Sequence, residues 1–472
     1  MKKYILRNIA IGLISFIGLT SCDDFLETKP GNASPTEDAI ENEEDLLVAI
    51  RGMYSALLSA DYYGNTFVMM GDIQGDDVQT SNVGKRTEQL YRFSYRQATV
   101  PVGLWEIPYK AINRANVILS AIENNGFIMT NAIKDYKGQA LATRALCHFN
   151  ILITYGYPYL KDQGASWGAS LVREPLKASS LPARSTVAEG YKMVIEDLEE
   201  ALKVIGTEVN NGKFNSWSVE ALLARVHLYK GDWDKAFEYA DHVASQSPYE
   251  LISNKDYLKA WEEEYTSESL FDLHISDLSS GNRELFGYVI HPKGYSAVVA
   301  TKEFEDLLNE DTLDIRTQLL KPVDTIPTSK FYVAKAPGRG GQPAVNNVRV
   351  LRLSDIYLIA AEAALKKSKP NQAKADFYLN EIIQRANPTA TDVVATEDLI
   401  LTERRKELVL EGHRFFDMMR LGKTYSRKGG YHILNDIDLV SPDWNDFRIV
   451  KAIPQGEIDV NPNIRKQQNP GY

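Results

Sequence analysis

Residues 216–249 read SWSVEALLARVHLYKGDWDKAFEYADHVASQSPY, the most regular pattern in the chain. The stretch predicts two helices that are joined at Gly231 and end before Pro248, because glycine and proline interrupt helices. Ala224 lies on the first helix and Ala236 on the second. Small residues at these positions allow two antiparallel helices to pack closely. The stretch therefore predicts a helical hairpin.

The spacing from Ala224 to Ala236 to Pro248 is that of a tetratricopeptide repeat, and residues 352–385 hold a second copy. Three or more such units are normally needed for a stable stack. We therefore expect two further helix pairs of this kind, formed by 43–60 with 102–123 and by 131–155 with 186–204. The predicted fold class is mostly α, with about four tetratricopeptide-like helix pairs that are interrupted by long irregular insertions.

The N-terminus predicts a lipoprotein signal peptide over residues 1–21. A positive start is followed by an apolar run at 9–19, and small residues come directly before Cys22. The run is shorter than the roughly 20 residues that span a bilayer. We expect Cys22 to be diacylated and to become the first residue of the mature protein; the alternative is an ordinary secretory signal in which Cys22 is incidental. Residues 22–35 then form a lipidated tether, and 36–472 form a single domain.

Composition indicates a globular protein with an acidic surface. The chain has 472 residues, of which 44% are hydrophobic and 25% are charged. Removing the three basic residues of 1–21 leaves 50 Lys and Arg against 63 Asp and Glu, a net charge of −13. Nucleic acid and anionic lipid are therefore not expected as primary partners. Cys147 is the remaining cysteine after lipidation, and we expect a buried, inert thiol there.

Three insertions interrupt the predicted helices, at 61–97, at 158–184 and between the two clear repeats from 269 onward. Long irregular segments between helices are often functional. A glycan site needs aromatic rings that cover sugar faces, together with carboxylates or amides that bind hydroxyls. The candidate ligand-binding residues on the insertions are Tyr62, Tyr63, Asp76, Asp77, Trp167, Tyr288 and Tyr295.

Residues 164–168 match the G-x-S-x-G pattern of serine hydrolases, with Ser166 as the serine. That pattern forms a nucleophile elbow only between a strand and a helix. Here a helix that ends at Pro158 precedes the serine, and a loop follows it. We therefore expect a plain loop and rank a hydrolase as a minor alternative. The chain has no H-E-x-x-H, Walker or Cys/His nucleophile pattern, and we expect a binding protein without catalysis.

Residues 397–421 predict one long helix with an apolar stripe. Glu403, Glu407, Glu411 and Arg414 form a charged line beside that stripe. Carboxylates four residues apart repel one another, so Arg414 or cations elsewhere in the fold should compensate them. We expect an ion-pair network that joins this helix to the repeats, in preference to a catalytic carboxylate pair.

The same helix carries a family resemblance. Residues 403–422, which contain ERRKEL, EGHRFFD and RLG, resemble the C-terminal signature of the SusD/RagB family of outer-membrane nutrient-binding lipoproteins. Segments 105–116, 352–363 and 453–472 also resemble family segments. The resemblance implies four tetratricopeptide-like pairs as scaffold, a ligand face built from the insertions, and no catalysis.

The resemblance further implies a lipid-anchored protein of the outer membrane that faces the cell exterior. It also implies a surface lid over a SusC-like, TonB-dependent outer-membrane barrel. The acidic residues Asp23, Asp24 and Glu27 resemble the family's surface-export signal. The expected function is the capture of an oligosaccharide and its delivery to that transporter.

The ligand and a metal site stay open in the sequence. The alternative ligand is a peptide, as for RagB-like members, and a peptide site would favour strand pairing over an aromatic platform. We expect no cofactor and no catalytic metal. A structural calcium site is open as an alternative, because oxygen ligands without EF-hand spacing occur at Asn435, Asp436, Asp438, Asp443 and Asp446.

Overall fold

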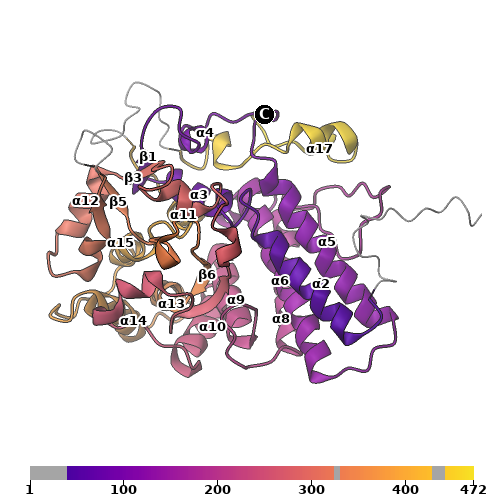
Figure 1. Cartoon of the computed structure of the whole chain (residues 1–472), viewed down its shortest axis with the longest axis horizontal. Helices are drawn as coiled ribbons and strands as arrows, with labels where there is room; N and C mark the ends of the chain where they lie inside the picture. Colours follow the sequence, from indigo (N-terminus) through magenta and orange to yellow (C-terminus); the bar gives the residue numbers. More distant parts are fainter. Residues whose placement is uncertain (1–39, 324–329, 428–441) are drawn as a thin grey trace, which may run out of the picture.

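The computed structural model describes residues 40–323, 330–427 and 442–472. The signal peptide, Cys22, the tether and the oxygen ligands at 435–438 lie outside the described residues. The described part is mostly helical, as predicted (Figure 1). Within it, no helix combines the length and the apolar character that a membrane span requires.

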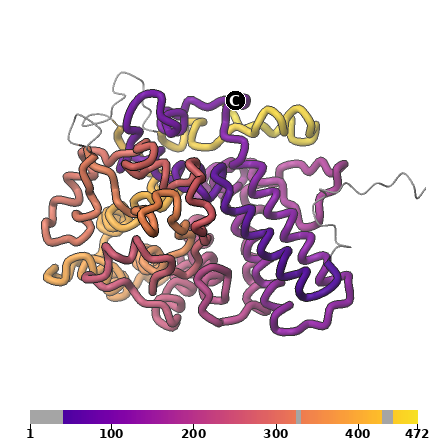
Figure 2. The backbone as a smooth tube through the Cα atoms, viewed as in Figure 1, coloured from indigo at the N-terminus to yellow at the C-terminus, as the bar shows by residue number. Residues whose placement is uncertain are grey.

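Eight helices of the described residues form the scaffold, and each packs against the scaffold helix that follows it along the chain. They lie close to their predicted positions: α2 (Glu43–Leu57), α5 (Gly103–Asn124), α6 (Asn131–Tyr155), α8 (Val187–Leu202), α9 (Ser216–Lys230), α10 (Trp233–Gln246), α13 (Leu353–Lys366) and α14 (Gln372–Ala386). Figures 1 and 2 show α2, α5, α6 and α8 side by side at one end of the molecule. The predicted pairs α2 with α5 and α6 with α8 are in contact.

Local signals at the helix ends explain why the scaffold could be predicted. Asn42 begins α2 with a capping box, in which its side chain accepts from backbone N–H groups and Asp45 bonds back. Gly231 ends α9 in the left-handed conformation, with φ of 80°. Gly156 is the C-cap residue of α6, but its backbone is extended rather than left-handed. It is needed for close packing, because a Cβ there would lie 2.6 Å from Val187.

Helix α6 is the centre of the scaffold, since α5 and α8 cover it on two sides. Every one of its residues from Gly138 to Leu152 is buried. Cys147 lies among them as a fully buried free thiol. Burial raises the pKa of this thiol to about 12, so the expected inert cysteine is confirmed.

The insertions contain short elements rather than plain loops. Their helices are α3 (Thr66–Ile73), α4 (Glu88–Tyr91), α7 (Tyr159–Asp162), α11 (Phe286–Ile290) and α12 (Lys302–Asn309). Short 3₁₀ turns lie at Asn254–Asp256, Lys259–Glu262, Asp277–Ser279, Ile315–Leu319, Arg339–Gly341, Phe447–Ile449 and Arg465–Gln467. Helix α3 was missed because every residue after Thr66 is buried, which leaves no amphipathic period to detect.

Three antiparallel strand pairs lie in the insertions or at their edges. They are β1 (Val78–Thr80) with β3 (Val298–Ala300), β2 (Ser269–Leu273) with β6 (Val348–Arg352), and β4 (Leu320–Pro322) with β5 (Phe331–Val333). In the first pair Val78 lies opposite Ala300, so the first insertion is bound to the third. A last helix, α17 (Gln455–Val460), lies near the C-terminus.

The predicted helix over 397–421 is wrong in one respect, because it is divided into α15 (Glu397–Leu408) and α16 (Arg414–Arg420). Leu410 and Gly412 between them have positive φ values of 61° and 87°. The connecting turn lies directly on α3, where a Cβ at Gly71 would come within 2.1 Å of the Gly412 carbonyl oxygen. The apolar and charged spacing continues across the break, so the sequence did not reveal it.

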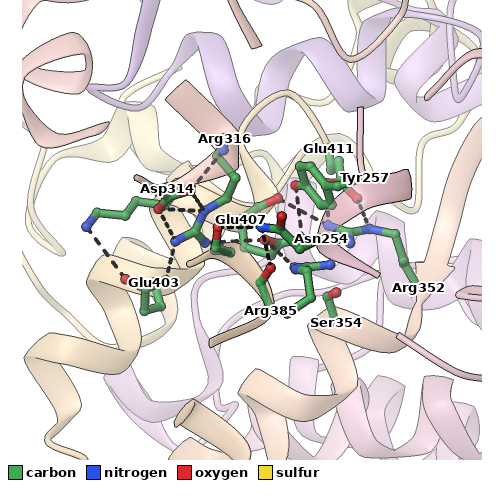
Figure 3. A network of polar contacts seen from close by, with 12 residues as sticks. Asn254, Tyr257, Asp314, Arg316, Arg352, Ser354, Arg385, Glu403, Glu407 and Glu411 are labelled. Carbon is green, nitrogen blue, oxygen red and sulfur yellow. Dashed lines mark hydrogen bonds and ion pairs between the residues drawn. The ribbon is translucent and has the colours of Figure 1, made fainter. Parts of the chain in front are cut away.

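The acidic line of α15 is buried in an ion-pair network, as expected (Figure 3). Its cations are Arg316, Lys335, Arg352 and Arg385, which come from the third insertion, β6 and α14. Arg352 alone contacts Glu268, Glu407 and Glu411, each at 2.8 Å. Arg414 does not take part, so these cations compensate the line. We call the carboxylates Glu268, Glu403, Glu407 and Glu411, together with these four cations, the Glu407 network.

Consecutive residues at the start of the signature enter three different clusters. Glu403 joins the Glu407 network through Arg316 at 2.8 Å. Arg404 binds Asp355 of α13 at 2.9 Å. Arg405 turns toward the first insertion and binds Asp77 at 2.6 Å. Buried charges require such partners, because an unpaired buried charge is strongly destabilising. The signature therefore holds the scaffold and two insertions together.

Candidate functional site

The first and third insertions meet beside the β1–β3 pair. Ser81 donates its hydroxyl to the Ser296 carbonyl at 2.5 Å and its N–H to the Ala297 carbonyl at 2.9 Å. Thr87 adds a weaker bond to the Ala297 carbonyl at 3.3 Å. These bonds fix residues 82–87 against the segment around 288–296.

Tyr288 and Tyr295 form an edge-to-face pair at this junction. Their ring centroids are 5.1 Å apart and their planes meet at 84°. Tyr288 lies on α11, and a turn through Gly294 returns the chain so that the Tyr295 N–H donates to the Tyr288 carbonyl at 2.9 Å. A Cβ at Gly294 would lie 2.0 Å from that carbonyl oxygen, so glycine is required for the turn. Both rings are half-buried and keep part of their surface open.

Charged side chains surround the two rings. The Arg86 guanidinium lies 4.6 Å from the Tyr295 ring centroid and binds Glu284 at 2.6 Å. Lys85 donates its ammonium to the Tyr295 carbonyl at 2.8 Å. The Arg283 guanidinium lies 5.9 Å from the Tyr288 ring centroid. We call these residues, Lys85, Arg86, Arg283, Glu284, Tyr288 and Tyr295, the Tyr288 cluster.

The Tyr288 cluster has the chemistry that a sugar site needs. Half-open tyrosine rings can cover the apolar face of a pyranose. Guanidinium, ammonium and carboxylate groups at the rim can bind hydroxyls or charged substituents. Two of the predicted candidates, Tyr288 and Tyr295, are brought together here.

Tyr62 and Tyr63 are placed in the core instead. They are 1% and 4% exposed. The Asn150 side-chain amide donates to both hydroxyls, at 2.5 and 2.9 Å, and both rings contact Phe67. Burial raises the pKa of Tyr63. Neither ring offers a surface to a ligand in this conformation.

Asp76 and Asp77 are engaged in ion pairs rather than open to solvent. Asp76 binds Arg414 and Asp77 binds Arg405, both at 2.6 Å. Burial opposes ionisation of Asp76, but Arg414 and Arg405 outweigh it and lower its pKa. Both carboxylates therefore serve to attach the first insertion to the C-terminal signature.

Trp167 lies on the second insertion, apart from the two tyrosines. It is 43% exposed and forms an isolated bridge with Thr186 at the start of α8. Its carbonyl accepts from Arg184 at 2.9 Å. In the described part of the chain no contact joins it to the Tyr288 cluster. Trp167 is thus available to a ligand only as a separate platform.

Ser166 lies in a loop, as predicted. No strand enters this segment, and α7, of four residues, precedes it. The Ser166 N–H donates to the Asp162 carboxylate at 3.1 Å. Its hydroxyl has no hydrogen-bond partner among the described residues, so no base is placed to activate it.

A cleft of about 780 Å³ lies elsewhere, between α5, α6 and the loop at 173–177. Its size suits a small ligand. Buried Arg144 at its base is fully engaged with Asp197 and Asn116, each at 2.8 Å. None of its described lining residues is aromatic, so it lacks a platform for a sugar ring.

The described residues contain no group of three or more His, Cys, Asp or Glu side chains that could hold a metal ion. Asp446, one of the oxygen ligands considered for calcium, binds Arg448 at 2.8 Å. Asp443 accepts the Asn445 N–H at 2.7 Å. Asn435, Asp436 and Asp438 lie outside the described residues, so the calcium prediction stays a prediction.

The cations of the Tyr288 cluster were missed from the sequence. Two charged residues follow one another on each insertion, Lys85-Arg86 on the first and Arg283-Glu284 on the third. This pattern is weak evidence for a binding site, because any solvated loop can carry neighbouring charged residues. Their meeting depends on the β1–β3 register, which joins residues more than 200 positions apart. Charge on two insertions therefore could not be assigned to one site without the structure.

Comparison with known proteins covers nearly the whole chain. Residues 239–472 match the profile of the SusD family. Residues 24–228 match a family described as "Starch-binding associating with outer membrane".

Several solved structures are similar to this chain over almost their full length. A SusD superfamily protein from Bacteroides vulgatus has a TM-score of 0.87 and 37% identity, covering 92% of this chain and 99% of that one. A second Bacteroides vulgatus structure, titled a putative sugar binding protein, has a TM-score of 0.83 and 36% identity over 91% and 98% of the two chains.

Among proteins compared by sequence, a SusD-like protein of Formosa agariphila is 23% identical over 99% of each chain.

Proposed function

This chain belongs to the SusD/RagB family, and from that premise we propose that it binds oligosaccharides at a bacterial cell surface and delivers them to a transporter. The observation that carries the proposal is the Tyr288–Tyr295 pair at the junction of two insertions. The description of the family that matches residues 24–228 names starch binding, and one similar structure is titled a "putative sugar binding protein". Both support a glycan as the ligand.

The pair is suited to sugars because it combines a rigid apolar surface with polar groups at its rim. The turn through Gly294 fixes the two rings before any ligand arrives, which reduces the conformational entropy lost on binding. Arg86 and Glu284 form an ion pair at 2.6 Å. Together they provide hydrogen-bond donors and an acceptor for sugar hydroxyls. A pyranose stacked on the open part of a ring would lie within reach of this rim.

Calorimetry of the purified body, residues 23–472, against oligosaccharide pools and peptide pools tests the ligand class. We expect saturable binding of at least one oligosaccharide pool and none of the peptides. Binding of peptides alone would reverse the choice of ligand in favour of the RagB-like alternative. Absence of binding by either class would contradict a capture function.

We propose that the protein acts without catalysis. The carboxylates of the Glu407 network are held in ion pairs, and Ser166 has no base beside it. Incubation with the oligosaccharides that bind should leave them intact. Turnover that disappears in Ser166→Ala would show that the hydrolase alternative is correct.

Attachment through Cys22 to the outer membrane, with the body facing outward, is part of the proposal. The matched family description includes association with the outer membrane, which supports it. Wild-type protein should fractionate with outer membranes and be cleaved by protease added to intact cells, whereas Cys22→Ala should be released. Membrane association of Cys22→Ala, or protection of the wild type, would contradict this part.

The proposed partner is a SusC-like, TonB-dependent barrel, since capture outside the cell does not by itself import a solute. The resemblance of residues 403–422 to the SusD/RagB signature supports this partner. Affinity purification from native outer membranes should recover such a barrel in stable complex. The complex should bind the oligosaccharide more tightly than this protein alone, because a second surface adds contacts to an already immobilised ligand. Recovery without a barrel would contradict delivery.

A further inference from the structure

We infer that the oligosaccharide is acidic, carrying carboxylate or sulfate groups. The inference rests on the proposed function and adds the chemical class of the glycan that the Tyr288 cluster takes. It depends on charges around the two rings that the described residues leave uncompensated.

Among the described residues, four cations lie beside the rings or in the turn between them, and one carboxylate is in contact with these cations. The cations are Lys85, Arg86, Arg283 and Lys293, and the carboxylate is Glu284. Glu284 is engaged by Arg86 at 2.6 Å. Arg283 and Lys293 are exposed, and in the described part of the chain neither contacts a carboxylate. The Tyr288 cluster together with Lys293 therefore carries an excess of positive charge.

This local charge is opposite in sign to that of the whole protein, which has a net charge of −10 over the chain. Arg352, by contrast, contacts three carboxylates, those of Glu268, Glu407 and Glu411. A positive site on a negative molecule attracts anions and raises their local concentration. It provides no such electrostatic attraction for a neutral starch-like glycan.

The positions of the cations suit a charged sugar that stacks on the rings. The Arg283 guanidinium lies 5.9 Å from the Tyr288 ring centroid, and Arg86 lies 4.6 Å from that of Tyr295. Lys293 occurs in the turn that joins the two tyrosines. A carboxylate or sulfate at the edge of a stacked pyranose could accept from a guanidinium in a two-pronged arrangement.

The expected preference is moderate, because ion pairs at exposed sites are individually weak and are screened by salt. We expect an acidic oligosaccharide to bind about tenfold more tightly than its neutral twin in 20 mM NaCl, and the ratio to shrink toward one in 0.5 M NaCl. The rings should give the neutral twin its remaining affinity.

The test uses pairs of oligosaccharides that differ only in charge. Oligogalacturonides and oligoalginates are compared with their carboxyl-reduced forms, and sulfated galactan oligosaccharides with their desulfated forms, by calorimetry at pH 7. Arg283→Gln and Lys293→Gln should lower the affinity for the acidic member of each pair more than the affinity for its neutral twin. Lys192→Gln, the same change at an exposed lysine of α8, is the matched control and should have no effect.

The results of these titrations distinguish a failure of the inference from a failure of the proposed function. Preference within the carboxylated pairs or within the sulfated pairs supports the inference and identifies the acidic group. Equal binding of acidic and neutral twins, or binding of neutral glycans alone, overturns the inference and leaves the proposed function intact. Binding of acidic peptides without any glycan overturns both. A preference that persists in the Arg283→Gln, Lys293→Gln double variant also overturns the assignment to these cations.

Discussion

Arg405 and Asp77 lie 328 positions apart in the sequence and meet in an ion pair at 2.6 Å. Beside it Arg414 binds Asp76 at the same distance. The two pairs tie the turn after α3 to the C-terminal signature. A carboxylate pair on an insertion, which suggested a ligand site in the sequence, is thus a structural attachment.

Asp77→Ala should destabilise the protein by about 3 kcal/mol, because it leaves the mostly buried Arg405 without its closest partner. Urea unfolding measured by circular dichroism gives the change. Asp398→Ala, at an exposed carboxylate of α15, is the control and should change stability by less than about 0.5 kcal/mol. Ligand affinity of folded Asp77→Ala should equal that of the wild type. Normal stability with lost affinity would instead make Asp77 a ligand-binding residue.

The scaffold could be predicted from the sequence because its signals are local. The apolar period of α2 and the cap at Asn42 lie within a few residues of each other, as do Gly231 and the helices that it separates. Helix α3 could not be predicted, since it is buried on all sides. The break before α16 could not be predicted either. One of its two residues with positive φ is Leu410, and leucine does not indicate a left-handed backbone in a sequence.

The candidate site could be predicted only in part. Tyr288 and Tyr295 were found by their place on an insertion, but the same rule selected Tyr62 and Tyr63, which are core. Aromatic residues serve cores and ligand platforms alike, and their exposure decides between the two roles. Lys85 and Arg283 belong to the site through long-range strand pairing, which no local pattern encodes.

Acid should weaken the Glu407 network through Glu411. Burial alone would raise the pKa of Glu411, but Arg352 and Lys335 lower it from 4.5 to about 2. Because the folded pKa is below the unfolded one, the stabilisation is complete above pH 4.5 and is lost as the pH falls toward 2. Glu411→Gln should therefore be less stable than wild type by about 3 kcal/mol at pH 7, with the difference shrinking below pH 4.5.

Urea unfolding of both proteins at pH 7, 5 and 3.5 tests this prediction. A difference in unfolding free energy that stays constant over this range would contradict the assignment of the ionised form to Glu411.

Lys451 should add a second pH dependence of the same sign, at higher pH. It is buried, and its ammonium donates to Gln74 at 2.8 Å and lies 4.7 Å from the Tyr95 ring centroid. No carboxylate contacts it among the described residues, and burial lowers its pKa from 10.5 to about 7. Between pH 7 and 10.5 the unfolded chain keeps a proton that the folded protein has released. The cost of burying Lys451 is therefore greatest at or below pH 7 and falls as the pH rises.

Lys451→Met should raise the free energy of unfolding at pH 6.5, by about 1 to 3 kcal/mol. The gain should diminish at pH 9.5, because the wild-type lysine is then neutral when folded. Chemical unfolding at the two pH values measures both quantities. An equal gain at both, or a loss at pH 6.5, would contradict a neutralised buried lysine.

The most direct test is calorimetric titration of the Tyr288→Ala, Tyr295→Ala double variant with the oligosaccharide pool that the wild type binds. Phe377→Ala, which removes an exposed ring from α14, is the matched control. Circular dichroism establishes that each variant is folded. The predicted result is a loss of affinity of at least about tenfold in the double variant, since each aromatic contact contributes roughly 0.5–1.5 kcal/mol beyond its buried area, with no loss in Phe377→Ala. Unchanged affinity in a folded double variant would contradict binding at this pair.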